Sequence, residues 1–223
     1  MTKSLFIQAI TKFALGVVLI ALLLFLPAGS IHYWNGWLFM GVLFLPMFAA
    51  GILMMLRNPG LLQKRLNARE KESAQREVVL GSGIMFLVGF VLCGLNYRFR
   101  WHILPDWIIG AATIVFLLSY ALYAEVLREN TYLSRTIEVQ DRQKVIDTGL
   151  YGIVRYPMYT VTILLFLSMP LILGSVVSLV IFLVYPLLLV KRIRNEEQVL
   201  TAQLEGYREY REKVRYRLIP FVW

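Results

Sequence analysis

The sequence predicts an all-α, multi-pass transmembrane protein with four full spans and a C-terminal membrane hairpin, about six membrane helices in all, and with both termini in the cytoplasm. Hydrophobic residues make up 58% of the 223 residues, and the mean hydropathy is +0.64. This composition leaves too little polar surface for a soluble domain. The apolar residues also occur in runs of roughly the 20 residues that a helix needs to cross a bilayer. We therefore expect lipid to cover most of the surface.

Four apolar runs are long enough to be full spans. They extend from about Phe6 to Pro27, Trp34 to Leu56, Val79 to Leu95 and Trp107 to Leu127. Aromatic residues lie between the first two runs, where amphipathic rings are typical of a membrane interface.

A fifth apolar region, from about Thr160 to Val190, is too long for a single span and predicts a hairpin. Pro170, Gly174 and Ser175 interrupt it near its middle. Each arm would contain about 14 to 16 residues, so the hairpin either crosses the bilayer or enters one leaflet only. In both cases its two ends return to the same side.

Basic residues predict the orientation. Six of them lie between residues 57 and 76, whereas the loop between the first two spans has none. Further basic residues precede the first span, occupy 128–155 and follow the hairpin, while only Arg98 and Arg100 fall on the opposite side. By the positive-inside rule, both termini and the last third of the chain face the cytoplasm.

The net charge predicts a membrane surface rather than a nucleic acid as the partner. The chain has 23 Lys+Arg and 14 Asp+Glu, a formal charge of +9. These charges cluster between the apolar runs, as expected of loops that face membrane lipids. We expect no nucleic-acid partner.

The segment before the hairpin is a candidate ligand-binding surface. Pro157 lacks a backbone N–H and pushes Tyr156 toward extended geometry, so a helix must break here. Irregular backbone at membrane depth is tolerated only where it is buried in protein or lines a polar cavity. The alternative is that Arg155, Tyr156 and Tyr159 are merely anchors at the membrane interface.

A second candidate follows the hairpin. Arg192 and Glu196 are four residues apart, so on a continuing helix a cation and a carboxylate point the same way. The alternative is a solvated pair worth a few tenths of a kcal/mol. In the tail, Tyr207 and Tyr210 share a helical face and Pro220 lies near the end, which suggests a segment folded back on the rest of the last third of the chain rather than a lipid anchor alone.

Together these segments resemble the isoprenylcysteine carboxyl methyltransferase family, including its bacterial members. The resemblance covers roughly residues 136–223: the tract from Gly149 to Tyr159, then Arg192, Glu196, Glu197 and Leu200, and the ending from Tyr207 to Trp223. The chain is accordingly expected to comprise N-terminal transmembrane helices, 1–130, and a catalytic half, 131–223. Membrane phosphatidylethanolamine methyltransferases share a related pattern, and sterol reductases have a similar C-terminal end.

The resemblance implies S-adenosylmethionine as cofactor and a lipophilic carboxylate, such as an isoprenylcysteine, as a methyl acceptor that enters from the bilayer. It implies no metal, and a site facing the cytoplasm, in a bacterial inner membrane. The implied catalytic residues are Arg192, which would orient the acceptor, and Glu196. The implied cofactor contacts are Gln140, Lys144, Val145, Ile146, Tyr151, Tyr156, Pro157, Met158, Tyr159 and Glu196.

Two positions depart from the family pattern, Tyr156 and Thr160, which replaces the small residue often found there, and three other functions stay open. Tyr156 stands where the family has His; it can stack and donate one hydrogen bond but cannot become a cation. A phospholipid or amine N-methyltransferase would need a base, for which Glu196 or Glu197 is the candidate. A membrane NADPH-dependent reductase lacks support from any Gly-rich dinucleotide fingerprint. A non-catalytic transporter or scaffold would normally carry ionisable residues inside its spans, and here they are scarce.

Overall fold

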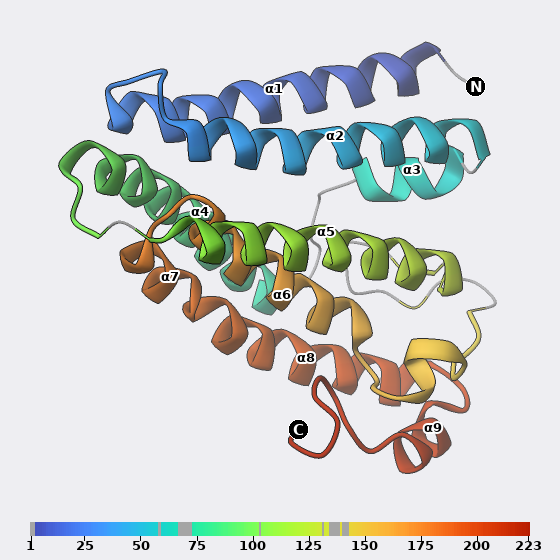
Figure 1. Cartoon of the computed structure of the whole chain (residues 1–223). Coiled ribbons are helices and arrows are strands. Elements are labelled where there is room, and N and C mark those ends of the chain that lie inside the picture. The colour runs from blue at the N-terminus through green and yellow to red at the C-terminus, as the bar shows by residue number, and fades with distance from the viewer. Residues whose placement is uncertain are drawn as a thin grey trace.

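The computed structural model describes residues 3–57, 59–66, 73–102, 104–130, 132–133, 139 and 143–223, and its regular structure in this part is entirely helical (Figure 1). The elements are α1 (Lys3–Ala28), α2 (Trp34–Arg57), α3 (Pro59–Leu66), α4 (Ser73–Phe99), α5 (Asp106–Glu129), the 3₁₀ helix η1 (Gly149–Gly152), α6 (Pro157–Ile172), α7 (Val176–Phe182), α8 (Val184–Gln203) and α9 (Tyr207–Lys213). The predicted all-α class is confirmed.

Five helical segments in the described part are long and apolar enough to cross a membrane. Four of them, in α1, α2, α4 and α5, correspond to the four predicted full spans, and the fifth is Val176–Gln203, which joins α7 and α8. The short helix α3, which the hydrophobic pattern did not indicate, packs against α2.

The predicted hairpin is present, but its arms are unequal. Its first arm, α6, has 16 residues, close to the predicted length. The second arm is longer than predicted because the helix continues through Lys191 to Gln203, well past its apolar part. The prediction counted only apolar residues, whereas helix length depends on backbone hydrogen bonds that polar residues make equally well.

Polar side chains from the first half of the chain hold the tip of the hairpin. The Tyr33 hydroxyl donates to the carbonyl of Leu173, 2.6 Å away, and Asn96 Nδ2 donates to the carbonyl of Gly174, 3.1 Å away. The last carbonyls of a helix have no partner within it, and in lipid such groups are costly to leave unpaired. These bonds therefore satisfy carbonyls that the end of α6 would otherwise leave unpaired.

Glycines let α4 lie close to its neighbours. α4 contacts α1 on one side and both α7 and α8 on another. A Cβ added at Gly94 would lie 2.6 Å from the backbone oxygen of Leu24 in α1. Small residues at helix contacts permit such backbone approach, which drives helix association in lipid.

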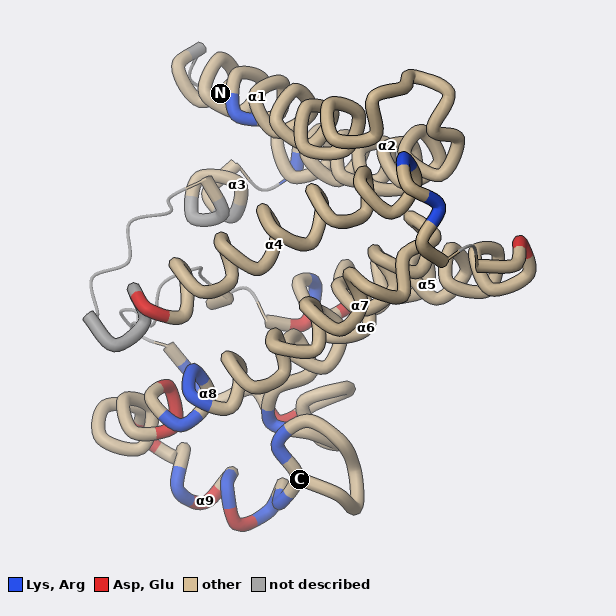
Figure 2. The backbone as a smooth tube through the Cα atoms, turned by 90° about the vertical axis from the view of Figure 1, so that its left-hand side faces the viewer, with Lys and Arg blue, Asp and Glu red and all other residues tan. Residues whose placement is uncertain are grey.

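The polar parts of the chain gather at one end of the helices. The N-terminal end of α1 and the C-terminal ends of α2, α5 and α8 point the same way, and α9 lies at that end (Figure 1). Figure 2 shows charged residues on the last turns of α8 and on α9, with long uncharged stretches in the other helices. This arrangement agrees with the charge pattern behind the predicted orientation, and the cytoplasmic location of this end stays a prediction.

We expect Gly94→Ala to destabilise the protein by about 1 to 3 kcal/mol, because the new methyl group meets backbone that cannot rotate away. The measurement is the apparent unfolding temperature of the purified protein in detergent. Gly83→Ala is the matched control in the same helix, since a Cβ there meets nothing within 4 Å. Equal unfolding temperatures for the two variants would contradict the close approach of α1 and α4.

Candidate functional site

A buried carboxylate joins three separate segments near the polar end. Glu197 of α8 is 6% exposed and lies between two arginines. Arg155 Nη2 donates to Oε1 at 2.6 Å, and Arg217 Nη2 donates to Oε2 at 2.7 Å. Arg155 also donates to the carbonyls of Val214 and Arg215, at 2.7 and 2.8 Å. The side chains of one helix, one turn and the tail thus form a single network.

Backbone hydrogen bonds extend the same contact. The N–H of Arg155 donates to the carbonyl of Tyr216, and the N–H of Tyr156 donates to the carbonyl of Arg217, both at 2.9 Å. Pro157 then begins α6 at the first helical position, where a missing N–H costs nothing. The tail therefore supplies partners for the irregular backbone before the hairpin, which confirms the prediction that it folds back.

Next to this network, α8 directs two charged side chains at one tyrosine of α6. Arg192 Nε donates to the Tyr159 hydroxyl at 2.8 Å, and that hydroxyl donates to Glu196 Oε2 at 2.5 Å. Tyr159 is 4% exposed, and both charged residues are partly buried. The interpretation of Arg192 and Glu196 as a solvated surface pair is therefore wrong. The four-residue spacing places them on either side of the phenol.

Tyr156, one of the two departures from the family pattern, has a partner of its own. Its ring stacks on Tyr159, with centroids 5.7 Å apart, and its hydroxyl lies 3.0 Å from the hydroxyl of Tyr207. Burial raises the pKa of Tyr156 well above its ordinary value and the pKa of Tyr207 to about 12. Both phenols are consequently neutral at physiological pH and act as hydrogen-bonding aromatic walls.

The end of α5 positions the loop that leads into η1. The Glu129 carboxylate accepts hydrogen bonds from the Thr148 hydroxyl at 3.2 Å and from the N–H of Leu150 at 3.1 Å. Gly149 lies against this carboxylate with φ of +51°, so a side chain there would be strained and would collide with Glu129. Sequence reasoning missed Glu129, since nothing in the pattern links it to a turn 20 residues later.

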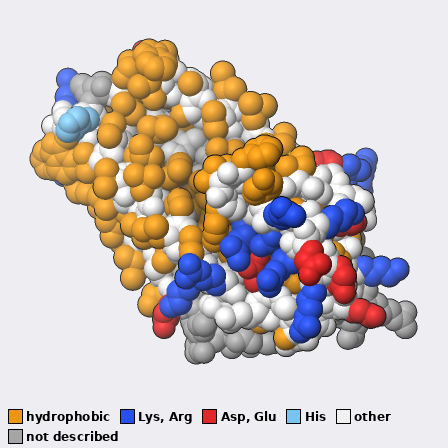
Figure 3. Space-filling model, turned by 90° about the horizontal axis from the view of Figure 1, so that it is seen from below, with side chains coloured by type: hydrophobic (Ala, Val, Ile, Leu, Met, Phe, Trp, Pro, Cys, Tyr) orange, Lys and Arg blue, Asp and Glu red, His pale blue; other side chains and the backbone are white. Residues whose placement is uncertain are grey.

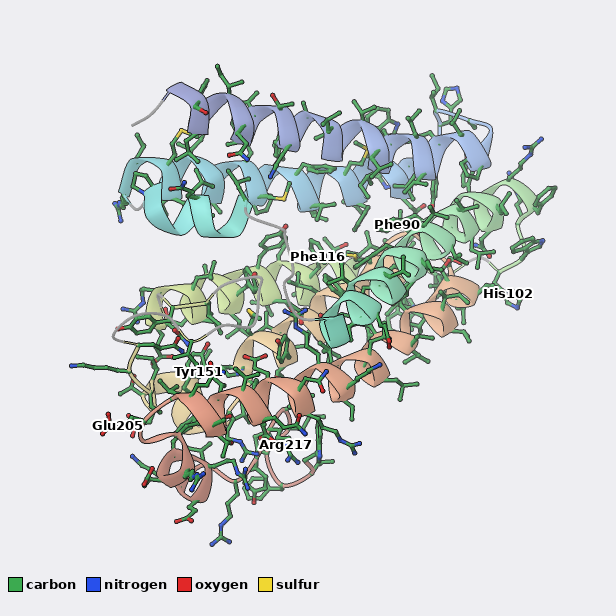
Figure 4. All side chains as sticks on the ribbon, turned by 180° about the vertical axis from the view of Figure 1, so that it is seen from behind. Phe90, His102, Phe116, Tyr151, Glu205 and Arg217 are labelled. Atoms are coloured by element: carbon green, nitrogen blue, oxygen red, sulfur yellow. The ribbon has the colours of Figure 1, made fainter. Side chains whose placement is uncertain are left out.

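α9 holds the same loop from the other side. The Tyr210 hydroxyl donates to the carbonyl of Tyr151 at 2.8 Å, and Lys213 Nζ donates to Asp147 Oδ2 at 2.7 Å. The hydrogen bond and charge of Lys213 lower the pKa of Asp147. In Figure 4, His102 lies at the right-hand end, Tyr151 lies toward the left, and Arg217 lies in the lower part of the molecule.

These segments surround a cavity that contains most of the predicted site residues. Its wall includes Lys144, Val145, Ile146, Tyr151, Tyr156, Met158, Tyr159, Arg192 and Glu196. The wall also includes residues outside the predicted site, among them Asn130, Leu133, Leu204, Tyr207 and Tyr210. Pro157 is buried at the start of α6 and does not line the cavity, and Gln140 falls outside the described residues.

The cavity offers chemically distinct groups within one small space. Glu196 supplies negative charge, Arg192 supplies positive charge, and the tyrosine rings with Leu200 and Leu204 supply flat or apolar surface. Such a set suits a ligand that carries both charge and an aromatic ring. The enclosed volume is about 100 Å³. Because drug-sized ligands occupy roughly 300 to 1,000 Å³, a ligand of that size requires the lining side chains to move.

Residues 108–202 match the model of the isoprenylcysteine carboxyl methyltransferase (ICMT) family. The matched segment contains almost all of α5, the loop into α6, the whole hairpin and all but the last residue of α8. It therefore includes Tyr159, Arg192 and Glu196, and it confirms the resemblance as far as residue 202, whereas the ending from Tyr207 to Trp223 lies outside the match. A search of curated proteins finds no match.

We expect Glu197→Gln to destabilise the protein by about 3 to 5 kcal/mol, because two arginines, one of them buried, lose their counter-charge. The measurements are the apparent unfolding temperature in detergent and the rate of protease cleavage in the tail. Glu212→Gln, at an exposed position of α9, is the control. If both variants resist heat and protease like the unmodified protein, the network does not hold the tail.

Proposed function

We propose that this chain, a member of the isoprenylcysteine carboxyl methyltransferase family through residues 108–202, transfers a methyl group from S-adenosylmethionine to the carboxylate of a lipophilic acceptor. A membrane methyltransferase is the activity that the family and the apolar helices support. The proposal for cofactor and acceptor depends chiefly on one observation, the hydrogen-bonded series Arg192, Tyr159 and Glu196 in the cavity wall.

The cavity fits the chemistry of the proposed cofactor. S-adenosylmethionine carries a positive sulfonium, an amino-acid group and an adenosine, and when bound it supplies a methyl group already activated for transfer. Glu196 can accept hydrogen bonds from its polar groups, and the Tyr151 and Met158 side chains offer surface for its apolar parts. Residues 143–146 also line the cavity and would enclose the cofactor together with α8. Because the enclosed space is small, the bonds of Tyr159 to Glu196 and Arg192 must partly open on binding.

An acceptor carboxylate needs orientation more than acid–base chemistry. An ionised carboxylate is already a nucleophile, so the protein has to align it with the methyl donor and exclude water. The guanidinium of Arg192 is suited to bidentate contact with a carboxylate. Arg192 lies at the boundary where α8 changes from the apolar run ending at Val190 to charged residues. A lipophilic acceptor could thus place its carboxylate at Arg192 while its chain stays in the bilayer.

An amine acceptor, the alternative, needs a base, and the geometry leaves one of the two candidate glutamates for that role. Glu197 is a poor candidate, because both of its oxygens already accept hydrogen bonds from arginines. Glu196, whose carboxylate lines the cavity, is the remaining one of the two. The carboxylate acceptor is preferred because Arg192 and Glu196 then both have a role.

We expect the purified protein to bind S-adenosylmethionine and S-adenosylhomocysteine, and not NADPH, when the three are titrated in parallel by calorimetry. Glu196→Gln should weaken S-adenosylmethionine binding about ten- to a hundredfold, the usual effect of removing charge from a charge-assisted hydrogen bond. Glu205→Gln, at an exposed position beyond the end of α8, is the control. Binding of NADPH in place of S-adenosylmethionine would overturn the proposal in favour of a reductase.

Arg192→Lys should show whether Arg192 binds the acceptor or the cofactor. Lysine keeps the charge but lacks the planar fork, so we expect a raised KM for a prenylated cysteine acceptor and lower kcat/KM, with S-adenosylmethionine affinity changed less than threefold. The assay is transfer of a labelled methyl group in detergent. Arg215→Lys, at an exposed position that does not line the cavity, is the control. Loss of cofactor binding with unchanged acceptor KM would assign Arg192 to the cofactor instead.

A further inference from the structure

A second hollow lies between α8 and α9, separate from the cavity. It is a shallow, largely open depression with a volume of about 490 Å³. Its wall includes Arg194, Gln198 and Thr201 of α8 and Arg208 and Arg211 of α9. The positions 194, 198 and 201 form a face of α8 different from the one that carries Arg192 and Glu196. No residue lines both spaces.

Three of the side chains that line the hollow are arginines, on segments that also carry Glu205, Glu209 and Glu212. Arg194, Arg208 and Arg211 are exposed, and none of them has a hydrogen bond or ion pair with any residue that the structure describes. The carboxylate in the wall, Glu197, is already paired with Arg155 and Arg217. Three guanidinium groups around one space repel one another, so an anion between them would be bound favourably.

A buried polar group at the same place also lacks a partner. The Thr201 hydroxyl is inaccessible to solvent and has no hydrogen-bond partner among the described residues. An unsatisfied buried polar group is unusual and costs free energy. The Thr201 hydroxyl is closed off from the hollow, but Arg194 and Gln198 of α8 and the two arginines of α9 line it, so a ligand with several acceptor oxygens would meet donors from both helices.

The hollow lies close to the apolar surface. α8 leaves its apolar run at Lys191, only three residues before Arg194. Figure 3 shows basic side chains gathered on the underside of the molecule, directly beside the apolar surface of the helices. Arginine forks match the oxygens of a phosphate group, and headgroup phosphates occupy this boundary in a bilayer.

We propose that the hollow between α8 and α9 binds a phosphate group, supplied by the headgroup of an anionic phospholipid. A bound headgroup would join α9 to α8 through Arg208, Arg211 and Arg194. Because α9 also carries Tyr207 and Tyr210 of the cavity wall, the lipid would steady one side of the candidate active site.

The test uses the full chain in mild detergent and measures the rise in unfolding temperature as a short-chain lipid is added. Phosphatidylglycerol is the anionic probe, phosphatidylcholine the zwitterionic one, and glycerol phosphate and inorganic phosphate the soluble ones. The variants are Arg208→Gln and Arg211→Gln, with Arg215→Gln as the matched control, since Arg215 is exposed nearby but does not line the hollow.

Phosphatidylglycerol should stabilise the unmodified protein and the Arg215→Gln control equally. Its apparent affinity should fall about tenfold in Arg208→Gln and in Arg211→Gln, the loss typical of one charge-assisted contact. The same dependence on these variants with glycerol phosphate or inorganic phosphate would support the phosphate site and assign it to a soluble ligand. Equal effects of phosphatidylglycerol on all variants, or no effect of any phosphate compound, would overturn the proposal.

Discussion

The pairing of one buried carboxylate, Glu197, with Arg155 and Arg217 is the interaction on which the arrangement of the candidate site depends. A buried charge is tolerated only when it is paired and hydrogen-bonded, so the three segments that carry these residues must meet. Successive residues of a helix point about 100° apart. Glu197 facing the tail therefore leaves Glu196 directed toward the cavity.

At both ends of the hairpin, residues from distant parts of the chain supply hydrogen-bond partners for backbone groups that lie outside the helices. At the tip, Tyr33 and Asn96 donate to the carbonyls that end α6 and form the turn. At the base, the tail accepts hydrogen bonds from the N–H groups of Arg155 and Tyr156. Short interruptions of helix thus become possible at places where water is scarce. The broken backbone at the base can then line a cavity.

Tyr156, which stands where the family pattern has histidine, is hydrogen-bonded to Tyr207 of α9. A histidine at this position could be charged, whereas Tyr156 stays neutral and shares a hydrogen bond with Tyr207 while stacking on Tyr159. The cavity wall here consists of three neighbouring phenols from two helices and a turn. The positive charge of the cavity wall comes instead from Lys144, Arg155 and Arg192.

The sequence by itself determined the spans, the break at Pro157 and the shared face of Arg192 and Glu196, because hydrophobic runs, a missing N–H and helical spacing act locally. Only the tertiary structure decided that Glu129 supports the η1 loop, that α9 completes the cavity and that Tyr159 lies between the two charges. Those contacts join residues 20 to 60 positions apart, and no local pattern encodes a hydrogen bond over such a separation. Packing of the helices brings the partners together, and the cost of unpaired polar groups selects the contacts that form.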